Sequence, residues 1–207
     1  MSCVIVVRHA MPEVVRGVSS RQWGLSEASR EDCVLLAHAL PPGIGRVWSS
    51  DERKAKETAD VVGRRLGLPV SVDVGFGEVD RPDVWDRDYR EVAAGYLGGA
   101  DEPGWEERAA VVRRFAAAVG RAQGGTTGDV VIVTHGMAMS LWVASVAPVA
   151  VVEWWRALTF PDAWRIEIET GVVERVWMGG ARRGGLVAGY SEFRHFDLKL
   201  VNSINSV

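Results

Sequence analysis

The sequence predicts an α/β fold, a three-layer sandwich in which a mostly parallel central sheet carries helices on both faces and antiparallel strands at its edge. Three observations predict it. Short apolar runs of strand length alternate with longer segments of helical periodicity. Two of these runs, at residues 3–7 and 130–133, are almost wholly aliphatic, as expected of buried strands. Near the end of the chain, residues 164–169 and 172–178 alternate around Thr170-Gly171, which predicts an antiparallel hairpin.

The elements follow from local patterns in chain order. Ser26 is a helix-capping residue, and Pro41-Pro42-Gly43 stops the helix that it begins. Ser49 and Glu52 have the spacing of a capping box for a second helix, which Gly67 ends. Strands are predicted at residues 3–7, 46–48, 70–74 and 130–133, and helices at 26–40, 53–66, 105–119, 136–147 and 153–157.

Residues 75–104 have no clear periodicity and are predicted to form a long irregular loop. Loops of this length in compact domains tend to be functional, so we expect this one to help choose the substrate. The domain is predicted to span residues 1–178. Residues 179–207 form a glycine-rich, basic linker and a tail with one weak strand at 196–201, expected to pack on the domain or on a neighbouring subunit.

Composition narrows the class of protein. With 207 residues, 47% hydrophobic and 25% charged, the chain can bury one full core. A net charge of −3 favours neither nucleic acid nor membrane as a partner, and no apolar stretch has the length of a membrane span. Cys3 and Cys33 make no disulfide framework, and a cytoplasmic location is expected. The Trp154-Trp155 pair fits either a homodimer interface or a core helix.

Arginine and histidine gather where the predicted strands end. Arg8-His9 closes the first apolar run, and His135 closes the run at 130–133. Ligands of parallel α/β sheets bind at those ends, and a buried guanidinium calls for an anion such as phosphate. His9 alone fits a core histidine equally well. Arg53 lies in the first turn of a helix at the same edge, although by itself it would be an ordinary surface arginine.

An acid is also needed for chemistry on a phosphate ester, and the loop after the third strand offers several. Glu78 is preferred by position, with Asp80, Asp83 and Asp86 as alternatives. The histidines have no metal-type spacing, so neither a metal nor a cofactor is expected.

Taken together, these residues resemble the histidine phosphatase superfamily, the phosphoglycerate mutase-like fold, in its branch of small phosphatases. The triplet at residues 8–10 is similar to that family's R-H-G. Residues 48–59 are similar to its S-S-x-x-x-R-A-x-x-T-A segment, with one departure at Lys54. Glu78 matches the acid after the third strand, and residues 134–136 match the second histidine motif.

The resemblance implies a metal-independent phosphatase that acts on a small-molecule phosphomonoester. His9 would attack phosphorus, and Glu78 would serve as general acid and then general base. Arg8, Arg53 and His135 would bind and neutralise the phosphoryl oxygens. A phosphoglycerate mutase and a non-catalytic phospho-ligand-binding module are the alternatives.

The chain departs from the family pattern after the first histidine. Ala10 stands in place of the usual glycine, and residues 11–15 lack the asparagine that often follows. Arg16 or Gln22 would have to supply the missing phosphate contact, and of these Gln22 is the expected one. Arg81, close behind Glu78, is the expected contact to the rest of the substrate.

Overall fold

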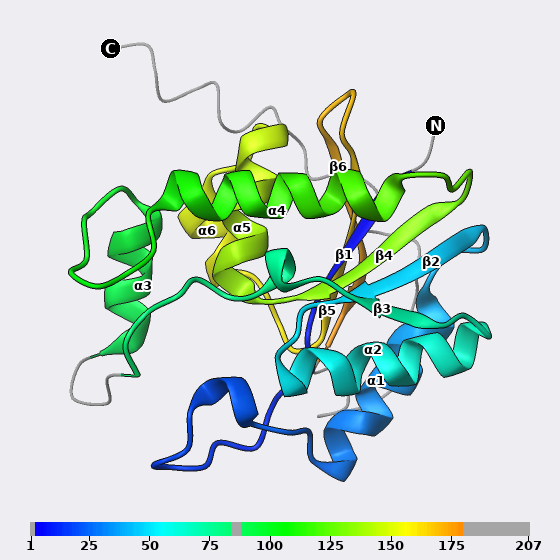
Figure 1. Ribbon diagram of the computed structural model, residues 1–207, viewed down its shortest axis with the longest axis horizontal. Helices are drawn as coiled ribbons and strands as arrows, with labels where there is room; N and C mark the ends of the chain where they lie inside the picture. Colours follow the sequence, from blue (N-terminus) through cyan, green and yellow to red (C-terminus); the bar gives the residue numbers. More distant parts are fainter. Residues whose placement is uncertain (1–2, 84–87, 180–207) are drawn as a thin grey trace.

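A six-stranded mixed sheet forms the centre of the computed structural model, which describes residues 3–83 and 88–179 (Figure 1). The strand order is β3-β2-β4-β1-β5-β6. The strands are β1 (Val4–Arg8), β2 (Ile44–Ser49), β3 (Val70–Val72), β4 (Asp129–Thr134), β5 (Asp162–Glu167) and β6 (Val172–Met178). The first four are parallel to one another, whereas β5 is antiparallel to both β1 and β6. The predicted fold class and the predicted hairpin are both confirmed.

Helices cover both faces of this sheet, as Figure 1 shows. The α-helices are α1 (Glu27–Ala39), α2 (Arg53–Leu66), α3 (Tyr89–Leu97), α4 (Arg108–Gln123), α5 (Gly136–Val146) and α6 (Val151–Arg156). Two short 3₁₀ helices, η1 (Ser20–Gln22) and η2 (Val74–Phe76), lie in the connections. No helix among the described residues is long and apolar enough to cross a membrane.

The central strands bury opposite faces in two separate cores. Val4 and Val6 of β1 pack with side chains of α3, α4, α5 and α6, whereas Ile5 and Val7 pack with α1 and α2. Because side chains alternate across a strand, one aliphatic run serves both layers. Trp154 and Trp155 are buried in the first core, so within the described chain they form no exposed apolar pair. The core-helix reading of these tryptophans is therefore the correct one.

The capping box predicted at Ser49 and Glu52 is wrong. Ser49 is the last residue of β2, and its hydroxyl donates to the carbonyl of Ser50. Helix α2 begins only at Arg53, and Glu52 occupies the cap position without a side-chain cap bond. The pattern therefore matched in sequence, but the strand extends through its first member. The carboxylate of Glu52 is left for other partners.

Residues 75–104 are more regular than predicted, because they contain η2 and the helix α3. The side chain of Asp88 caps α3 by accepting from the N–H of Arg90, and the helix buries Ala93, Ala94, Tyr96 and Leu97. Glycines within and after this helix weaken its periodicity, so packing against α5 and α6 decides it. The weak strand predicted at residues 196–201 lies outside the described residues, as do Trp85, Asp86 and Arg87 of the loop.

Candidate active site

His9 and His135 lie side by side at the C-terminal ends of β1 and β4. The two strands are parallel neighbours in register, with Arg8 opposite Thr134, and the backbone N–H of His9 donates to the carbonyl of Thr134 at 3.0 Å. The ring centroids are 5.1 Å apart, and both side chains are buried. Residues 126 positions apart in sequence thus form one cluster by sheet pairing alone.

The hydrogen bonding of His9 leaves one ring nitrogen free to react. Nδ1 lies 2.7 Å from the carbonyl oxygen of Ala10. Because a carbonyl only accepts, Nδ1 carries the proton and Nε2 keeps its lone pair. Burial, followed by the charges of His135 and Lys54, holds the pKa of His9 well below its ordinary value of 6.5. The ring is therefore neutral at neutral pH, as a nucleophile has to be.

Ala10, which replaces the usual glycine, fits its surroundings. Its methyl group is buried with Leu25, Cys33 and Val61, and its N–H donates to the hydroxyl of Thr58 at 3.1 Å. The loop after His9 therefore accepts a β-carbon, because small and apolar neighbours surround it.

Ser50 hydrogen-bonds to the ring of His135. The hydroxyl oxygen of Ser50 lies 2.7 Å from Nε2 and also accepts the N–H of Glu52 at 3.3 Å. The hydroxyl of Ser50 can donate its own proton to Nε2, and in that tautomer Nδ1 of His135 carries the ring proton. Nδ1 is buried without a hydrogen-bond partner in the described part of the chain. A buried N–H of this kind is available to an oxyanion.

Arg8 is a half-buried cation without an ion-pair partner among residues 3–83 and 88–179. One terminal nitrogen donates to the carbonyl of Leu158 at 3.1 Å, the guanidinium stacks 3.5 Å from the Phe160 ring centroid, and Nε has no partner. Burial lowers the pKa of Arg8 to about 10, so the group stays charged at neutral pH. An unpaired buried guanidinium is costly, and a bound anion would remove that cost.

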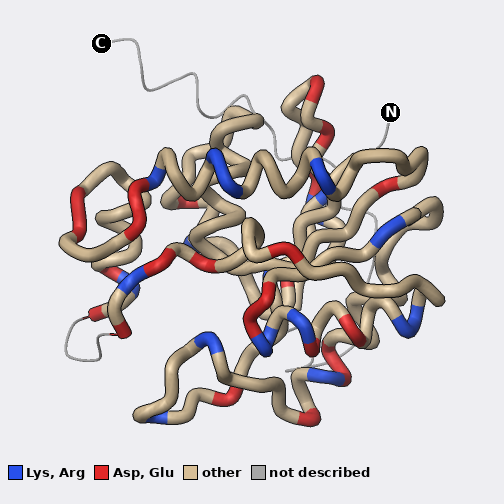
Figure 2. Tube along the Cα trace, viewed as in Figure 1, with Lys and Arg blue, Asp and Glu red and all other residues tan. Residues whose placement is uncertain are grey.

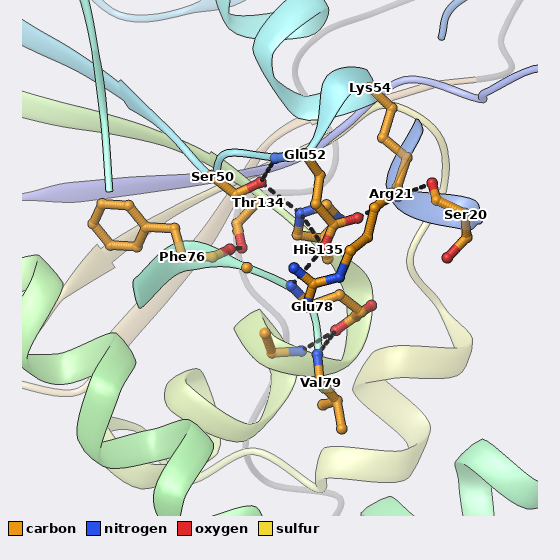
Figure 3. A network of polar contacts seen from close by, with 12 residues as sticks. Ser20, Arg21, Ser50, Glu52, Lys54, Phe76, Glu78, Val79, Thr134 and His135 are labelled. Carbon is orange, nitrogen blue, oxygen red and sulfur yellow. Dashed lines mark hydrogen bonds and ion pairs between the residues drawn. The ribbon is translucent and has the colours of Figure 1, made fainter. Parts of the chain in front are cut away.

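The carboxylate of Glu78 lies against the N-terminus of α5, the helix that begins directly after His135. This carboxylate accepts the N–H groups of Ala138 at 2.9 Å, Met137 at 3.3 Å and Val79 at 3.0 Å (Figure 3). A helix N-terminus stabilises a negative charge, which explains why a carboxylate rests here. Of the alternative acids, Asp80 is largely exposed beside Arg21, Asp83 contacts Ser20, and Asp86 lies outside the described residues.

Two adjacent basic residues of α2 face different surroundings. The guanidinium of Arg53 pairs with Glu57 at 2.7 Å, and its side chain is 61% exposed. The side chain of Lys54 is only 7% exposed, and its ammonium bonds to the carbonyl of Ser20 and to Glu52 (Figure 3). Successive helix residues point about 100° apart, so only one of the two can enter the cluster. The structure brings Lys54, and not Arg53, to the histidines.

Lys54 could have been found by counting. In the S-S-x-x-x-R-A-x-x-T-A pattern that starts at Ser49, the basic position is residue 54, one after Arg53. The same helix face carries Thr58, which accepts the N–H of Ala10 and donates to the carbonyl of Lys54. Spacing within the helix therefore indicated residue 54 as the inward one. The prediction chose Arg53 because the pattern has an arginine at this position and residue 54 is a lysine. Figure 2 shows charges of both signs together where α2 begins.

Gln22 and Arg53 lie together beside the cluster, at a cavity that Glu52 also lines. Both line a cavity of about 700 Å³ between α2 and the segment before α1. Neither His9 nor Glu78 lines this cavity. Arg16 is exposed in the same segment. Arg21, which the sequence analysis did not single out, lies close enough for its charge to lower the pKa of His135.

Arg81 packs against two aromatic rings. Its guanidinium lies 4.6 Å from the ring centroid of Tyr89 and 5.6 Å from that of Trp105, and its buried Nε has no hydrogen-bond partner among the described residues. Burial and the charge of Glu78 raise the pKa of Tyr89, which places this aromatic clamp within electrostatic reach of the acid. No group of three metal-ligating side chains occurs in the described residues.

The buried histidines predict a pH-dependent stability. Above pH 6.5 His9 and His135 are neutral in both folded and unfolded chains, but below it only the unfolded chain takes up their protons. The free energy of unfolding is therefore expected to fall between pH 7.5 and 5.5, with a slope approaching about 1.4 kcal/mol per pH unit for each histidine. Urea unfolding across this range measures it. The slope should be smaller in His9→Ala, and an equal slope would contradict the assignment.

The chain is similar to known proteins over most of its length. The model of the histidine phosphatase superfamily (branch 1) matches residues 4–171. No curated protein matches the chain. Mycobacterial glucosyl-3-phosphoglycerate phosphatase Rv2419c is similar in structure, with a TM-score of 0.66 and 22% identity over 86% of this chain and 99% of its own.

Two further solved structures share the fold. Bacillus stearothermophilus YhfR has a TM-score of 0.67 and 19% identity, covering 84% of this chain and 95% of its own. A putative alpha-ribazole-5'-P phosphatase of Escherichia coli has a TM-score of 0.63 and 16% identity, covering 89% and 99%. At these identities the structures establish the fold, and the family model adds the sequence pattern over most of the chain. The chain belongs to branch 1 of the histidine phosphatase superfamily.

Proposed function

We propose that the protein is a metal-independent phosphatase that hydrolyses a small phosphomonoester through a phosphohistidine on His9. The observation that carries this proposal is the arrangement of His9, whose Nδ1–H is held by the Ala10 carbonyl while Nε2 is left with its lone pair beside the half-buried Arg8, which has no ion-pair partner among the described residues. A neutral nucleophile next to an uncompensated cation suits attack on a phosphate dianion.

The reaction has two steps. Nε2 of His9 attacks phosphorus, the ester P–O bond breaks, and protonated Glu78 gives its proton to the leaving alkoxide. Water then attacks the phosphohistidine, Glu78 takes a proton from that water, and the P–N bond breaks to release inorganic phosphate. The products are the alcohol and phosphate, and both side chains return to their starting states.

Charge on the transferring phosphoryl group is neutralised by Arg8, Lys54 and the Nδ1–H of His135. In this proposal Lys54 takes the part that the sequence analysis expected of Arg53. Its ammonium has three donors, and the described residues engage two of them, at Ser20 and Glu52. Arg53 and Gln22 line the cavity between α2 and the segment before α1. They are not needed for the phosphoryl group, and any contact that they make would be with the organic part of the substrate.

Relatives support a phosphomonoester substrate and leave its organic part open. The similar structures include a glucosyl-3-phosphoglycerate phosphatase and a putative alpha-ribazole-5'-P phosphatase, and the phosphate esters in these two names have different organic parts. The mycobacterial enzyme has also been solved with VO₃ and with inorganic phosphate. In this chain the Arg81 clamp on Tyr89 and Trp105 is the candidate for recognising the alcohol.

Hydrolysis in EDTA tests this function, and the leaving group tests the acid. The wild-type protein is expected to hydrolyse both p-nitrophenyl phosphate and glycerol phosphate without added metal. Glu78→Gln should lose about 10²–10⁴-fold in kcat/KM for the alkyl ester. It should lose far less in kcat/KM for p-nitrophenyl phosphate, which reports formation of the phosphohistidine, because that leaving group needs no proton. Steady-state kinetics measures kcat/KM for both esters, and the burst of p-nitrophenolate measures formation of the phosphohistidine directly.

Other outcomes would favour the alternatives. Phosphate binding without turnover of any ester would indicate a phospho-ligand-binding module. Exchange of phosphoryl groups between 2- and 3-phosphoglycerate at the rate of hydrolysis would indicate a mutase. Equal losses in kcat/KM on both esters in Glu78→Gln would remove Glu78 from the role of general acid.

A further inference from the structure

The wall of the phosphate site contains a buried carboxylate that the proposed reaction does not use. Glu52 is 3% exposed and lies at the start of α2. One oxygen accepts from the Lys54 ammonium, and the other accepts the backbone N–H of Glu78 at 3.0 Å and lies 3.5 Å from Nε2 of His135 (Figure 3). One side chain therefore touches the cation, the acid-bearing loop and the second histidine.

A negative charge at this place works against phosphate. Arg8 and Lys54 are positive, and Glu52 is held ionised because Lys54 and the N–H of Glu78 keep its pKa below the ordinary value, against the effect of burial. The pair is closed off from water, so its charge is weakly screened and acts on any anion bound beside it. A site built only for tight phosphate binding would have no use for this carboxylate.

We propose that Glu52 is a positioning residue that directs Lys54 at the phosphoryl group and limits how tightly the site holds inorganic phosphate. The proposal rests on the proposed function, because it concerns the same site. Lysine has a long, flexible stem, and two fixed acceptors, the Ser20 carbonyl and Glu52, restrict it to one orientation. The remaining donor of the ammonium is then available at a constant place, while the charge of Glu52 offsets part of the attraction for the product.

Glu52→Gln separates these effects, because glutamine keeps the shape and removes the charge. Inorganic phosphate is expected to bind about tenfold more tightly by isothermal titration calorimetry, which equals about 1.4 kcal/mol. Turnover of p-nitrophenyl phosphate is expected to fall, with a lower inhibition constant for phosphate, because the product leaves more slowly. Damage to the fold alone weakens binding and does not tighten it.

The same helix offers a matched control in Glu57. This carboxylate pairs with Arg53 and Arg30 outside the cluster, with its side chain 16% exposed. Glu57→Gln removes the same charge from α2, and its phosphate affinity is expected to stay within about twofold of the wild type. Glu52→Asp keeps the charge and withdraws it from Lys54, so it should bind phosphate no more tightly than the wild type.

Each result bears on the proposal. Unchanged or weaker phosphate binding by Glu52→Gln would overturn it, as would equal tightening in Glu57→Gln or tightening in Glu52→Asp. Glu52→Met, which removes the charge with an apolar side chain of similar length, replaces Glu52→Gln if the latter does not fold. The calorimetry needs no turnover. A wild type that binds phosphate without hydrolysing esters would therefore contradict the proposed function alone, and a lack of phosphate binding in every variant would contradict this proposal too.

Discussion

His9→Ala is expected to lower kcat for phosphate-ester hydrolysis by a factor on the order of 10⁴ or more, because removal of a nucleophile takes away the covalent route as a whole. The variant keeps Arg8, Lys54 and His135, so it should still bind inorganic phosphate. The wild type should form an acid-labile, alkali-stable phosphoprotein when quenched during turnover, and His9→Ala should form none.

His38→Ala is the matched control for that experiment. His38 lies in the last turn of α1, and its ring contacts the guanidinium of Arg65, which is not part of the histidine cluster. Its replacement should leave turnover within about twofold of the wild type. A phosphoprotein that persists in His9→Ala, or full activity in that variant, would rule out His9 as the nucleophile.

The second large effect is expected at Lys54, with its neighbour as the comparison. Lys54→Met should lower kcat/KM by about 10²–10³-fold, the loss typical when one donor to a developing charge is removed. Arg53→Met should stay within about threefold, because Arg53 is exposed and its guanidinium is engaged by Glu57. Both variants remove one positive charge from adjacent positions, so a general change in net charge affects them equally.

The fold of Lys54→Met has to be checked, because the change leaves Glu52 buried without its cation. Circular dichroism and the thermal midpoint serve this purpose. The double variant Glu52→Met/Lys54→Met removes the pair together and should recover stability but not kcat/KM. A greater loss in Arg53→Met than in Lys54→Met would return the phosphate contact to Arg53, where the sequence analysis expected it.

The sequence predicted the sheet and the central part of the site from the same observations. Aliphatic runs that end in Arg8-His9 and in His135 implied parallel strands with histidines at one edge, and the register of β1 and β4 brings them together. Glu78 was preferred over three nearby aspartates by its place after the third strand, and it lies at the start of α5. The predicted sheet and the predicted positions of these side chains are confirmed, because strand burial and strand ends are local features with a direct consequence in a parallel sheet.

Tertiary contacts decided the rest. The sequence placed two cations in a row, and only the phase of α2 against the segment before α1 turns Lys54 inward and leaves Arg53 with Glu57. The spacing of Ser49 and Glu52 predicted a helix cap. In the structure Ser49 pairs with β4 as part of β2, and the Glu52 carboxylate instead accepts from Lys54.

By itself, then, the sequence determined the fold class and the position of the two histidines, Arg8 and Glu78 at one edge of the sheet, while their roles stay predictions. Local periodicity and strand ends carry that information. Which cation lies beside the histidines, how Ser50 bonds to His135 and where Glu52 rests were decided only by the tertiary structure. The physical reason is that a helix rotates by about 100° per residue and a hydroxyl proton follows its neighbours. A shift of one residue or one hydrogen bond therefore changes the site without changing the pattern in the sequence.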